Sequence, residues 1–541
     1  MGLLWSRYTI FLAVLASNIV IVALGALQDC RFYLPLVILL PLAIVGLHDL
    51  IQGSHAILRN YPIIGHVRFI LEAVRPEIRQ YLIEDESDPV PFSREQRAVV
   101  YQRAKNVFDK QPFGTVRDVN APGYGWVAHS IAPQEPANHD FRVNIGGSDC
   151  QKPYRASLLN ISGTSFGAVS ANAILAFNLG ARRGGFAHNT GEGSISRHHR
   201  RHRGDLIWQI ATGYFGCRTP DGRFDPVAFQ RQSSDDQVKM IEVKLSQGAK
   251  PGHGGVLPKA KITREIARTR GVSRDRDCVS PAAHPEFDTP FSLLLFIQML
   301  RRLSGGKPVG IKLCIGHRYE FLAILKAIQK VGVAPDFIVI DGGEGGTGAA
   351  PRELANHVGL PLADALKFAH SALVGAGLRD TIKLGASGKI ITGYDIFRTL
   401  AMGADYVMSA RGFMFAVGCI QARTCHSNRC PTGVATQSFW RQRALVVKDK
   451  AQRVDNFHRN SLKALAELVG AAGLGHPSEI RPGHIYQRDG NGLAIRGDQA
   501  FMTLAPGSLV DGTATGPIAL EWARARADSF LPADEPQRLQ A

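Results

Sequence analysis

The stretch PVGIKLCIGHRYEFLAILKAIQKVGVAPDFIVIDGGEGGTG, residues 308–348, contains the unit from which much of the chain is built. A short apolar run, 308–316, is followed by an amphipathic pattern and then by a second apolar run that ends in a glycine-rich loop, 336–348. Apolar runs that alternate with helical periodicity predict parallel strands joined by right-handed crossover helices. The stretch is therefore interpreted as one β-α-β unit.

Similar runs recur on both sides of this stretch. Eight of them, most ending in glycine-rich or polar loops, match the strand count and length of a (β/α)8 TIM barrel, an α/β fold. An open doubly wound sheet is the alternative, but no G-x-G-x-x-G sequence opens a β-α-β unit near the start. DCVSP, 277–281, is a possible ninth strand. The eight predicted strands are 157–163, 184–193, 206–213, 240–250, 308–316, 336–348, 382–390 and 405–412.

The N-terminal part predicts a transmembrane helical hairpin. Residues 8–27 carry no charge, and a second apolar run, 32–47, follows a short polar turn. The first run is long enough to cross a bilayer. A signal peptide is the alternative, but a second apolar run stands where soluble sequence would follow a cleavage site. Arginines shortly after the hairpin predict a cytoplasmic location for both of its ends, in the inner (cytoplasmic) membrane; they are Arg59, Arg68, Arg75 and Arg79.

Four regions follow from these patterns. We expect the transmembrane hairpin in 1–52, an adapter segment in 53–150, the barrel with a cysteine loop in 151–470, and a C-terminal extension in 471–541. The catalytic domain would lie on the cytoplasmic side. The last nine residues, 533–541, are expected to be disordered because they are polar and lack an apolar pattern.

The composition describes a globular protein that can bury a large core, with 45% hydrophobic and 20% charged residues. The formal net charge is +17. The densest basic run, RHHRRHR at 197–203, has no interleaved aromatic residues and lies in no recognisable nucleic-acid-binding motif. We therefore expect no nucleic acid among the partners, and the positive charge suits a position close to an anionic membrane surface.

The stretch CIQARTCHSNRCPTGVATQ, 419–437, holds three of the eight cysteines at the spacing C-x5-C-x4-C. Thiolates this close can bind one inorganic centre if the backbone turns tightly, and the proline after Cys430 favours such a turn. From the spacing alone, a zinc site with His426 as a further ligand and three core thiols remain alternatives. The other five cysteines are scattered singly, which favours reduced thiols over a disulfide framework.

The last two predicted strands end where barrels of this kind usually hold a phosphate. Their loops read ASGK, 386–389, and SARG, 409–412. Backbone N–H groups at glycines could bind phosphate oxygens, and a neighbouring cation could add charge. Ordinary turns are the alternative, but the pairing at consecutive strand ends favours a phosphate. The residues concerned are Gly388, Lys389, Arg411 and Gly412.

Five motifs, taken in order, resemble the FMN-binding synthase domain of glutamate synthase. A shorter branch, the FMN-binding glutamate synthase family proteins, is similar also in the N-terminal hairpin and in RNYPIIGHVRFILE, 59–72. The resemblance implies an FMN barrel with a 3Fe–4S cluster at its rim, bound by Cys419, Cys425 and Cys430. The five motifs are SGTSFGAVS (162–170), HNTGEG (188–193), QGAKPGHGG (247–255), DGGEGGTGAAP (341–351) and CHSNRCPTGVATQ (425–437).

The family reaction reduces the imine of 2-oxoglutarate and ammonia to L-glutamate, which makes the chain an expected oxidoreductase acting on CH–NH2 donors. The resemblance implies catalytic roles for Glu192, Gln209 and Lys250. Lys244 and Lys312 lie inside apolar strands, where a buried charge needs a partner such as a phosphate or a substrate carboxylate. Arg270 is a weaker candidate for a substrate carboxylate, and for His370 packing and function are both open. Together with the phosphate loops, the expected cofactor contacts are Ser165, Gly167, Lys312, Asp341, Gly343, Thr347, Gly388, Lys389, Arg411 and Gly412.

The chain also departs from that family's longer members. It has no domain-sized sequence for glutamine hydrolysis and no nucleotide-binding fingerprint. We therefore expect free ammonia or a separate ammonia-supplying subunit, and electrons from ferredoxin or another donor protein. The segment SPAAHPEF, 280–287, lacks the expected paired histidines, which leaves the substrate open. The alternatives are a flavin and iron–sulfur oxidoreductase for another amino or keto acid, and an electron-transfer subunit of a membrane complex.

Overall fold

The computed structural model describes residues 7–534 apart from residues 54, 86, 87, 89, 90, 137 and 502. The chain divides into two compact units, Met1–Asp88 and Pro89–Ala541. The boundary falls inside the region 53–150 that was interpreted as an adapter. Residues 535–541, most of the tail expected to be disordered, lie outside the described residues.

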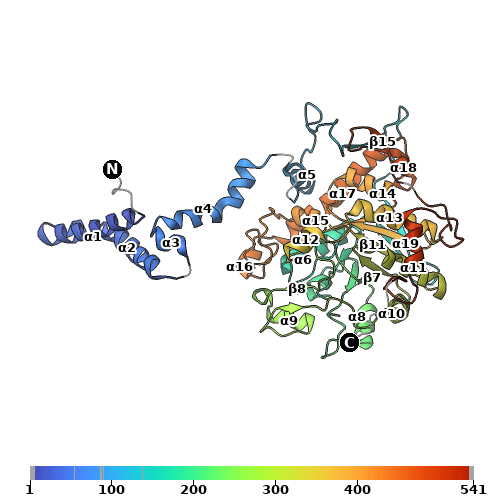
Figure 1. The fold of residues 1–541 in the computed structure, drawn as a ribbon, viewed down its shortest axis with the longest axis horizontal. Helices are drawn as coiled ribbons and strands as arrows, with labels where there is room; N and C mark the ends of the chain where they lie inside the picture. The colour runs from blue at the N-terminus through green and yellow to red at the C-terminus, as the bar shows by residue number, and fades with distance from the viewer. Residues whose placement is uncertain are drawn as a thin grey trace. The chain divides into compact units, whose positions relative to one another are not determined.

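Two apolar helices begin the smaller unit (Figure 1). Helix α1, Thr9–Leu27, and helix α2, Leu36–Ile51, are joined by a turn that contains the short helix η1, Cys30–Tyr33. Asn18 Nδ2 in α1 donates a hydrogen bond to the carbonyl of Leu39 in α2 at 3.0 Å. Two segments, Thr9–Leu27 and Cys30–Ile51, are long and apolar enough to cross a membrane, a test that signal sequences and buried core helices also pass.

A buried carboxylate ties the end of α2 to helix α4, Gly65–Ile78. Asp49 is fully buried and accepts hydrogen bonds from the backbone N–H of Ile63 at 2.9 Å and from His66 Nε2 at 3.0 Å. A buried charge is tolerated when its oxygens are paired in this way. The smaller unit therefore includes α4 as well as the hairpin. Its remaining elements are α3 (Ala56–Asn60) and η2 (Arg79–Ile83).

A closed barrel of eight parallel strands forms the larger unit, in the order β10-β11-β12-β13-β4-β5-β6-β7. Each of the eight predicted runs contributes one strand, so the barrel is confirmed and the open sheet is rejected. Nearly all strand residues are buried, because core and helices cover both faces, and this makes the runs continuously apolar. The strands are β4 (Leu159–Ile161), β5 (His188–Asn189), β6 (Leu206–Ile210), β7 (Val238–Lys244), β10 (Val309–Leu313), β11 (Phe337–Asp341), β12 (Lys383–Ser387) and β13 (Tyr406–Ser409).

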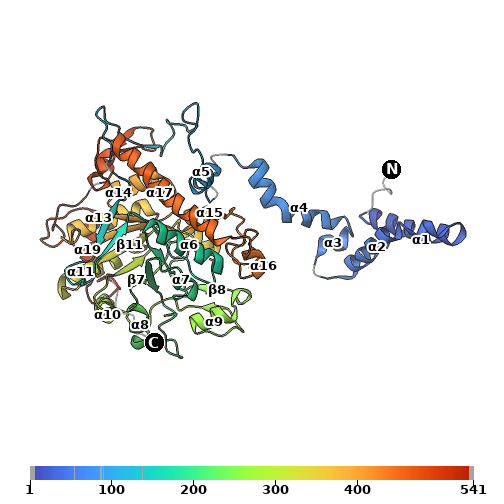
Figure 2. The ribbon, with the colours of Figure 1, turned by 180° about the vertical axis from the view of Figure 1, so that it is seen from behind.

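Helices surround this barrel (Figures 1 and 2). Polar side chains cap several of their N-termini: Ser170 accepts from the backbone of Ala173, and Thr289 and Thr392 form capping boxes. These caps end the strand-to-helix loops at defined points. The helices are α6 (Ala171–Gly184), α7 (Arg197–Arg200), α8 (Pro226–Ser233), α10 (Pro290–Leu303), α11 (Arg318–Val331), α13 (Leu362–Gly375), α14 (Gly393–Ala401), α15 (Arg411–Ala416) and α17 (Val447–Ala471).

The possible ninth strand lies outside the barrel. β9, Cys278–Val279, pairs antiparallel with β8, Val256–Leu257, in the loop region after β7. β8 and β9 pair over only two residues. An apolar run this short does not show from the sequence whether it belongs to the barrel. Other short elements flank the barrel: η3 (Lys259–Lys261), α9 (Arg264–Arg270), α12 (Arg352–His357), α16 (Phe439–Gln442), η4 (Pro477–Glu479), η5 (Pro482–His484), α18 (Gly497–Ala500) and α19 (Pro517–Arg524).

Segments from both sides of the barrel sequence pack against it. Helix α5, Arg94–Lys105, begins at the capping box of Ser93 and Gln96 and lies along α17. A three-stranded sheet, β1-β14-β15, joins residues that are more than 350 positions apart in the sequence. The larger unit therefore begins well before the first barrel strand. The strands outside the barrel are β1 (Gly125–Val127), β2 (Arg142–Ile145), β3 (Tyr154–Ser157), β14 (Ile485–Arg488) and β15 (Ala494–Arg496).

Candidate active site

The carboxyl ends of β7, β10 and β11 carry charged side chains that interact across the mouth of the barrel. Lys312 Nζ lies 3.7 Å from Asp341 Oδ2 and donates to Ser162 Oγ at 3.3 Å. Asp341 also accepts from the backbone N–H of Gly248 at 3.0 Å. The buried lysine was expected to need an anionic ligand, but its partner is a carboxylate of the same chain. Lys312 and Asp341 are thus brought together as a pair.

A second ion pair joins the β5 and β7 loops. Lys244 Nζ donates to Glu192 Oε2 at 2.5 Å and to Gln247 Oε1 at 3.1 Å. An external anion was expected as the partner of Lys244, but here too the partner is a carboxylate of the chain. Gly255 leaves room for this pair, because a Cβ at that position would displace the Glu192 carboxylate. The pair lines a pocket of about 290 Å³ together with Thr212, Ser246 and His253.

Two further buried cations lie near Glu192. Lys250 and Arg270 are 2% and 3% exposed, and both lower the pKa of the Glu192 carboxyl group through their charge. Burial would raise the pKa of Glu192, but Lys244 with these two cations outweighs it and holds the pKa below its usual value. Arg270 Nη2 donates to the carbonyl of Phe166, and its Nε has no partner among the described residues. Three cations therefore share one carboxylate.

Gln209 has a buried partner, Glu242, that was not predicted from the sequence. Gln209 Nε2 donates to Glu242 Oε1 at 2.5 Å, and Asn189 Nδ2 donates to the same oxygen at 2.8 Å. Glu242 is fully buried, and its other oxygen has no partner among the described residues. Glu242 could have been identified from the sequence, because it is a charged residue inside the apolar run MIEVKL and a buried charge needs a partner.

The loop after β12 and the first residue of α15, just after β13, bring two cations close together. Lys389 and Arg411 are partly buried; burial lowers the pKa of Lys389, and the nearby Arg411 charge lowers it further. Arg411 Nη2 donates to the carbonyl of Glu344 at 3.0 Å, so the glycine-rich loop after β11 folds over it. Gly388 belongs to the loop with Lys389, whereas Gly412 lies inside α15 rather than in a loop.

The other residues that were predicted to contact the cofactor lie in the loops after β4 and β11. Ser165 packs beside Gly191, where a Cβ would approach its backbone nitrogen to 2.8 Å. Gly167 adopts a φ of 107°, which favours glycine. Gly343 donates its N–H to the carbonyl of Leu360, and Thr347 is exposed on the same loop.

His370, for which packing and function were both open, and His284, in the segment SPAAHPEF, have structural partners. His370 lies in α13, where Arg379 Nε donates to its Nδ1 at 3.1 Å and burial lowers its pKa to about 4. His284 donates from Nε2 to the carbonyl of Lys244 at 3.0 Å and accepts from the Tyr214 hydroxyl at 2.9 Å. The segment SPAAHPEF, which differs from the family pattern, therefore contacts the end of β7 through the backbone of Lys244, the residue that pairs with Glu192.

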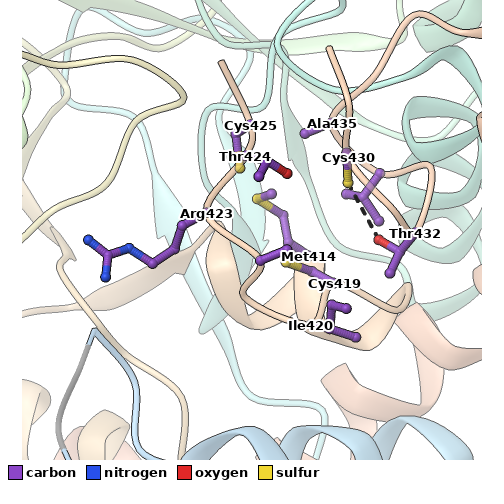
Figure 3. A pocket seen from close by; sticks show the side chains of 11 residues that line it. Met414, Cys419, Ile420, Arg423, Thr424, Cys425, Cys430, Thr432 and Ala435 are labelled. Atoms are coloured by element: carbon purple, nitrogen blue, oxygen red, sulfur yellow. Dashed lines mark hydrogen bonds between the residues drawn. The ribbon is translucent and has the colours of Figure 1, made fainter. Parts of the chain in front are cut away.

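The three clustered cysteines line one pocket of about 250 Å³, with Met414 between them (Figure 3). Burial raises the pKa of Cys419 to about 12 and also raises that of Cys425. For Cys430 burial acts in the same direction but is outweighed by hydrogen bonds, the strongest from the backbone of Ala435, so its pKa is lowered. Within the described part of the chain, no three His, Cys, Asp or Glu side chains are placed to hold a metal ion.

A buried lysine and a partly buried glutamine connect this cysteine loop to the loop after β4. Lys261 Nζ donates to the carbonyls of Ala168 at 2.6 Å and Cys425 at 3.1 Å. Gln437 Nε2 donates to the carbonyls of Gly167 and Val169 at 3.1 and 3.0 Å. The cysteine pocket is therefore fixed against the first strand-to-helix loop of the barrel. Sequence reasoning missed Lys261, which lies in no motif.

Comparisons with known proteins agree with one another. The family profile for the conserved region in glutamate synthase matches residues 137–475. A glutamate synthase large subunit-like protein, YerD of Bacillus subtilis (strain 168), is 39% identical over 521 residues, covering 88% of this chain and 98% of that protein. An archaeal NADPH glutamate synthase of Methanocaldococcus jannaschii is 34% identical over 322 residues, 59% of this chain and 60% of that protein.

Two kinds of solved structure are also similar. A flavocytochrome b2 mutant with pyruvate bound has 12% identity and a TM-score of 0.41, covering 84% of this chain and 91% of that chain. A mandelate oxidase mutant has 15% identity and a TM-score of 0.39, covering 80% and 97%. The family assignment therefore rests on the sequence matches, which extend over more than half of the chain. This chain belongs to the family defined by the conserved region of glutamate synthase.

Proposed function

We propose that this chain is an FMN- and iron–sulfur-dependent oxidoreductase that reductively aminates 2-oxoglutarate to L-glutamate. The observation that carries the proposal is the group of buried charges at the barrel mouth, where Lys244, Lys250 and Arg270 face the single carboxylate of Glu192. The excess of two positive charges suits a dicarboxylate substrate, because buried cations need anionic partners. The membership in the glutamate synthase family supports the same substrate.

The residues present fit both cofactors. Partly buried Lys389 and Arg411 at neighbouring strand ends would hold the FMN phosphate, and Ser165, Gly167 and Lys312 would approach its ring. Cys419, Cys425 and Cys430 would hold the cluster, whose irons are bound by separate thiolates, so the sulfurs need to surround a pocket rather than one point. When bound, FMN would supply the hydride, and the cluster would supply electrons to the flavin.

The protein residues bind the substrate and move a proton. Arg270 and Lys250 would bind the two carboxylates of 2-oxoglutarate, and Glu192 would accept a proton as ammonia condenses with the keto group. The lowered pKa of the Glu192 carboxyl group keeps it ionised at neutral pH, so it has room for a proton. The overall balance is 2-oxoglutarate, ammonium, two electrons and two protons in, and L-glutamate and water out. Ammonia would arrive free or from a separate subunit.

The assay follows from this balance. Detergent-purified protein with FMN fully loaded, reduced by a chemical donor and given 2-oxoglutarate with 15N-ammonium, is expected to form 15N-glutamate. Mass spectrometry of the product measures it, and pyruvate in place of 2-oxoglutarate is the control for the second carboxylate. Absence of labelled glutamate from a protein with full flavin content would reject the proposed substrate, and an absorption spectrum without flavin bands would reject the enzyme class.

We propose further that the hairpin anchors the chain in the inner membrane with the barrel in the cytoplasm. Beyond the hairpin, α4 is amphipathic: Val67, Ile70, Leu71 and Val74 share one exposed apolar face, as in helices that lie at a membrane surface. Arg59, Arg68, Arg75 and Arg79 supply the cytoplasmic positive charge.

The exposed Cys30 in the turn between the helices reports on this orientation. In intact cells, a membrane-impermeant maleimide is expected to label Cys30 from outside, and the Cys30→Ser variant should lose that labelling. Both proteins should stay in the membrane pellet after carbonate extraction. Labelling that requires permeabilised cells would invert the orientation, and release by carbonate would remove the hairpin from the proposal.

A further inference from the structure

An aromatic and basic surface lies next to the cysteine pocket. Phe439 and Trp440, in the short helix α16, are 64% and 73% exposed, and they contact each other edge to face at a ring distance of 5.5 Å. Arg443 covers the Trp440 ring at 5.2 Å. Large exposed aromatic side chains beside arginines are typical of the energetically dominant part of protein interfaces. We call Phe439, Trp440, Arg423, Arg429, Arg441 and Arg443 the α16 face.

The charge of this face is one-sided. The sequence from Cys419 to Lys448 contains five lysines and arginines and no aspartate or glutamate. The four arginines of the α16 face form no ion pair with any described residue, whereas many other surface arginines do, including Arg197 with Glu265 and Arg459 with Asp455. A surface with unmatched cations attracts an acidic partner and raises its association rate.

The α16 face is fixed to the cysteine loop. Arg441 Nη1 donates to the carbonyl of Arg429 at 3.2 Å, and Asn172 Nδ2 donates to the carbonyls of Gln442 and Leu445 at the end of α16. Arg423 lines the cysteine pocket, and its guanidinium extends away from the sulfurs (Figure 3). A protein bound to this face would therefore lie beside the pocket.

We propose that the α16 face is the docking site for an acidic, one-electron donor protein that reduces the iron–sulfur cluster. This rests on the proposed function, which needs two electrons from outside for each glutamate formed. Two successive encounters would supply them: in each, the donor's own reduced centre loses one electron to the cluster, which would pass that electron to the flavin before the next encounter, so that the flavin gains two. The two protons come from water. Trp440 and Phe439 provide the buried contact, and the arginines select an acidic partner.

The test compares a protein donor with a small one. Full-length protein in detergent is mixed by stopped flow with a reduced acidic 2Fe–2S ferredoxin, or with reduced methyl viologen, which needs no docking surface. The readout is the absorbance of the enzyme's cofactors, so it does not depend on glutamate formation. For Trp440→Ala and for the double variant Arg441→Glu/Arg443→Glu, we expect the second-order rate with ferredoxin to fall tenfold or more, as for a central interface residue.

The rate with methyl viologen and the iron content should stay at wild-type values in both variants. In the wild type, the ferredoxin rate should fall as salt is raised, because the attraction is electrostatic. Two matched controls lie elsewhere on the surface and should keep the ferredoxin rate: Leu520→Ala, an exposed apolar residue of α19, and Arg201→Glu, an exposed arginine after α7.

Three results would overturn the docking site. The first is equal ferredoxin rates in the wild type and both α16-face variants. The second is a wild type that accepts electrons from methyl viologen but not from ferredoxin. The third is variants that keep the ferredoxin rate but lose binding to vesicles containing anionic lipid, which would assign the α16 face to the membrane. Failure to form glutamate with either donor would instead count against the proposed reaction.

Discussion

Replacement of Cys425 by serine is expected to remove nearly all iron from the protein while FMN stays bound. The three cysteines surround one pocket, and each would bind a separate iron, so one missing thiolate leaves one iron without its protein ligand. A serine hydroxyl is a much poorer ligand because it ionises far less readily than a thiol. The measurements are iron and acid-labile sulfide per chain, with flavin fluorescence after heat release.

The control separates the cluster from general damage. Cys30→Ser removes an exposed cysteine that belongs to the other unit and should leave both iron and flavin unchanged. Unchanged iron in Cys425→Ser would mean that the pocket holds no cluster and that the three cysteines are core thiols. Loss of flavin together with iron would indicate that the links of Lys261 and Gln437 to the β4 loop transmit the damage.

The barrel was predictable because its signal is local. A strand covered on both faces must be apolar at nearly every position, so each of the eight strands can be recognised from a few consecutive residues. β5 is the weakest case: its ladder is two residues long, and the predicted run 184–193 was recognised mostly from the glycine-rich loop that follows. The prediction of a possible ninth strand at 277–281 was wrong for the barrel. The two residues of β9 pair with β8 outside it, and so short an apolar run does not show which sheet it joins.

The site was predicted less completely because its pairings are long-range. Lys244 and Lys312 stand out as charges in apolar strands, but Glu192 comes from the loop after β5 and Asp341 from β11, and no local pattern encodes which charges meet. The same holds for Glu242, which receives the amides of Gln209 and Asn189. The sequence motifs located the right loops; the partners within them follow from the closure of the barrel.

Replacement of Glu192 by glutamine is expected to lower kcat/KM for 2-oxoglutarate by about 100- to 1,000-fold, in the range of a lost acid–base group. The amide keeps the shape and can still accept a hydrogen bond from Lys244, but it cannot take a proton. It also leaves Lys244, Lys250 and Arg270 without a carboxylate. Steady-state kinetics with a chemical electron donor measures the effect, and Glu353→Gln, an exposed glutamate of α12, is the matched control.

Glu192 should also change the acid stability of the protein. Its pKa is lowered in the folded state, so its ion pair stabilises the fold above the unfolded pKa of about 4.3, and that contribution is lost as pH falls through the folded pKa. Between pH 5 and 3, wild-type stability should therefore fall more steeply than that of Glu192→Gln, as measured by urea unfolding. Parallel pH profiles would show that Glu192 is not ionised differently in the folded and unfolded chains.

A double-mutant cycle with Lys244→Met distinguishes catalysis from structural pairing. Lys244 and Glu192 are both largely buried, at 10% and 17% side-chain exposure, so loss of either charge breaks a buried ion pair and destabilises the fold. The loss is larger for Glu192→Gln, because Glu192 keeps Lys250 and Arg270 nearby when Lys244 is removed, whereas Lys244 loses its carboxylate when Glu192 is removed. The double variant removes both charges and is expected to recover part of that stability. Its activity should nevertheless stay as low as that of Glu192→Gln, because the proton acceptor is still missing. Recovery of activity together with stability would assign Glu192 a purely structural role and place the proton transfer on another group.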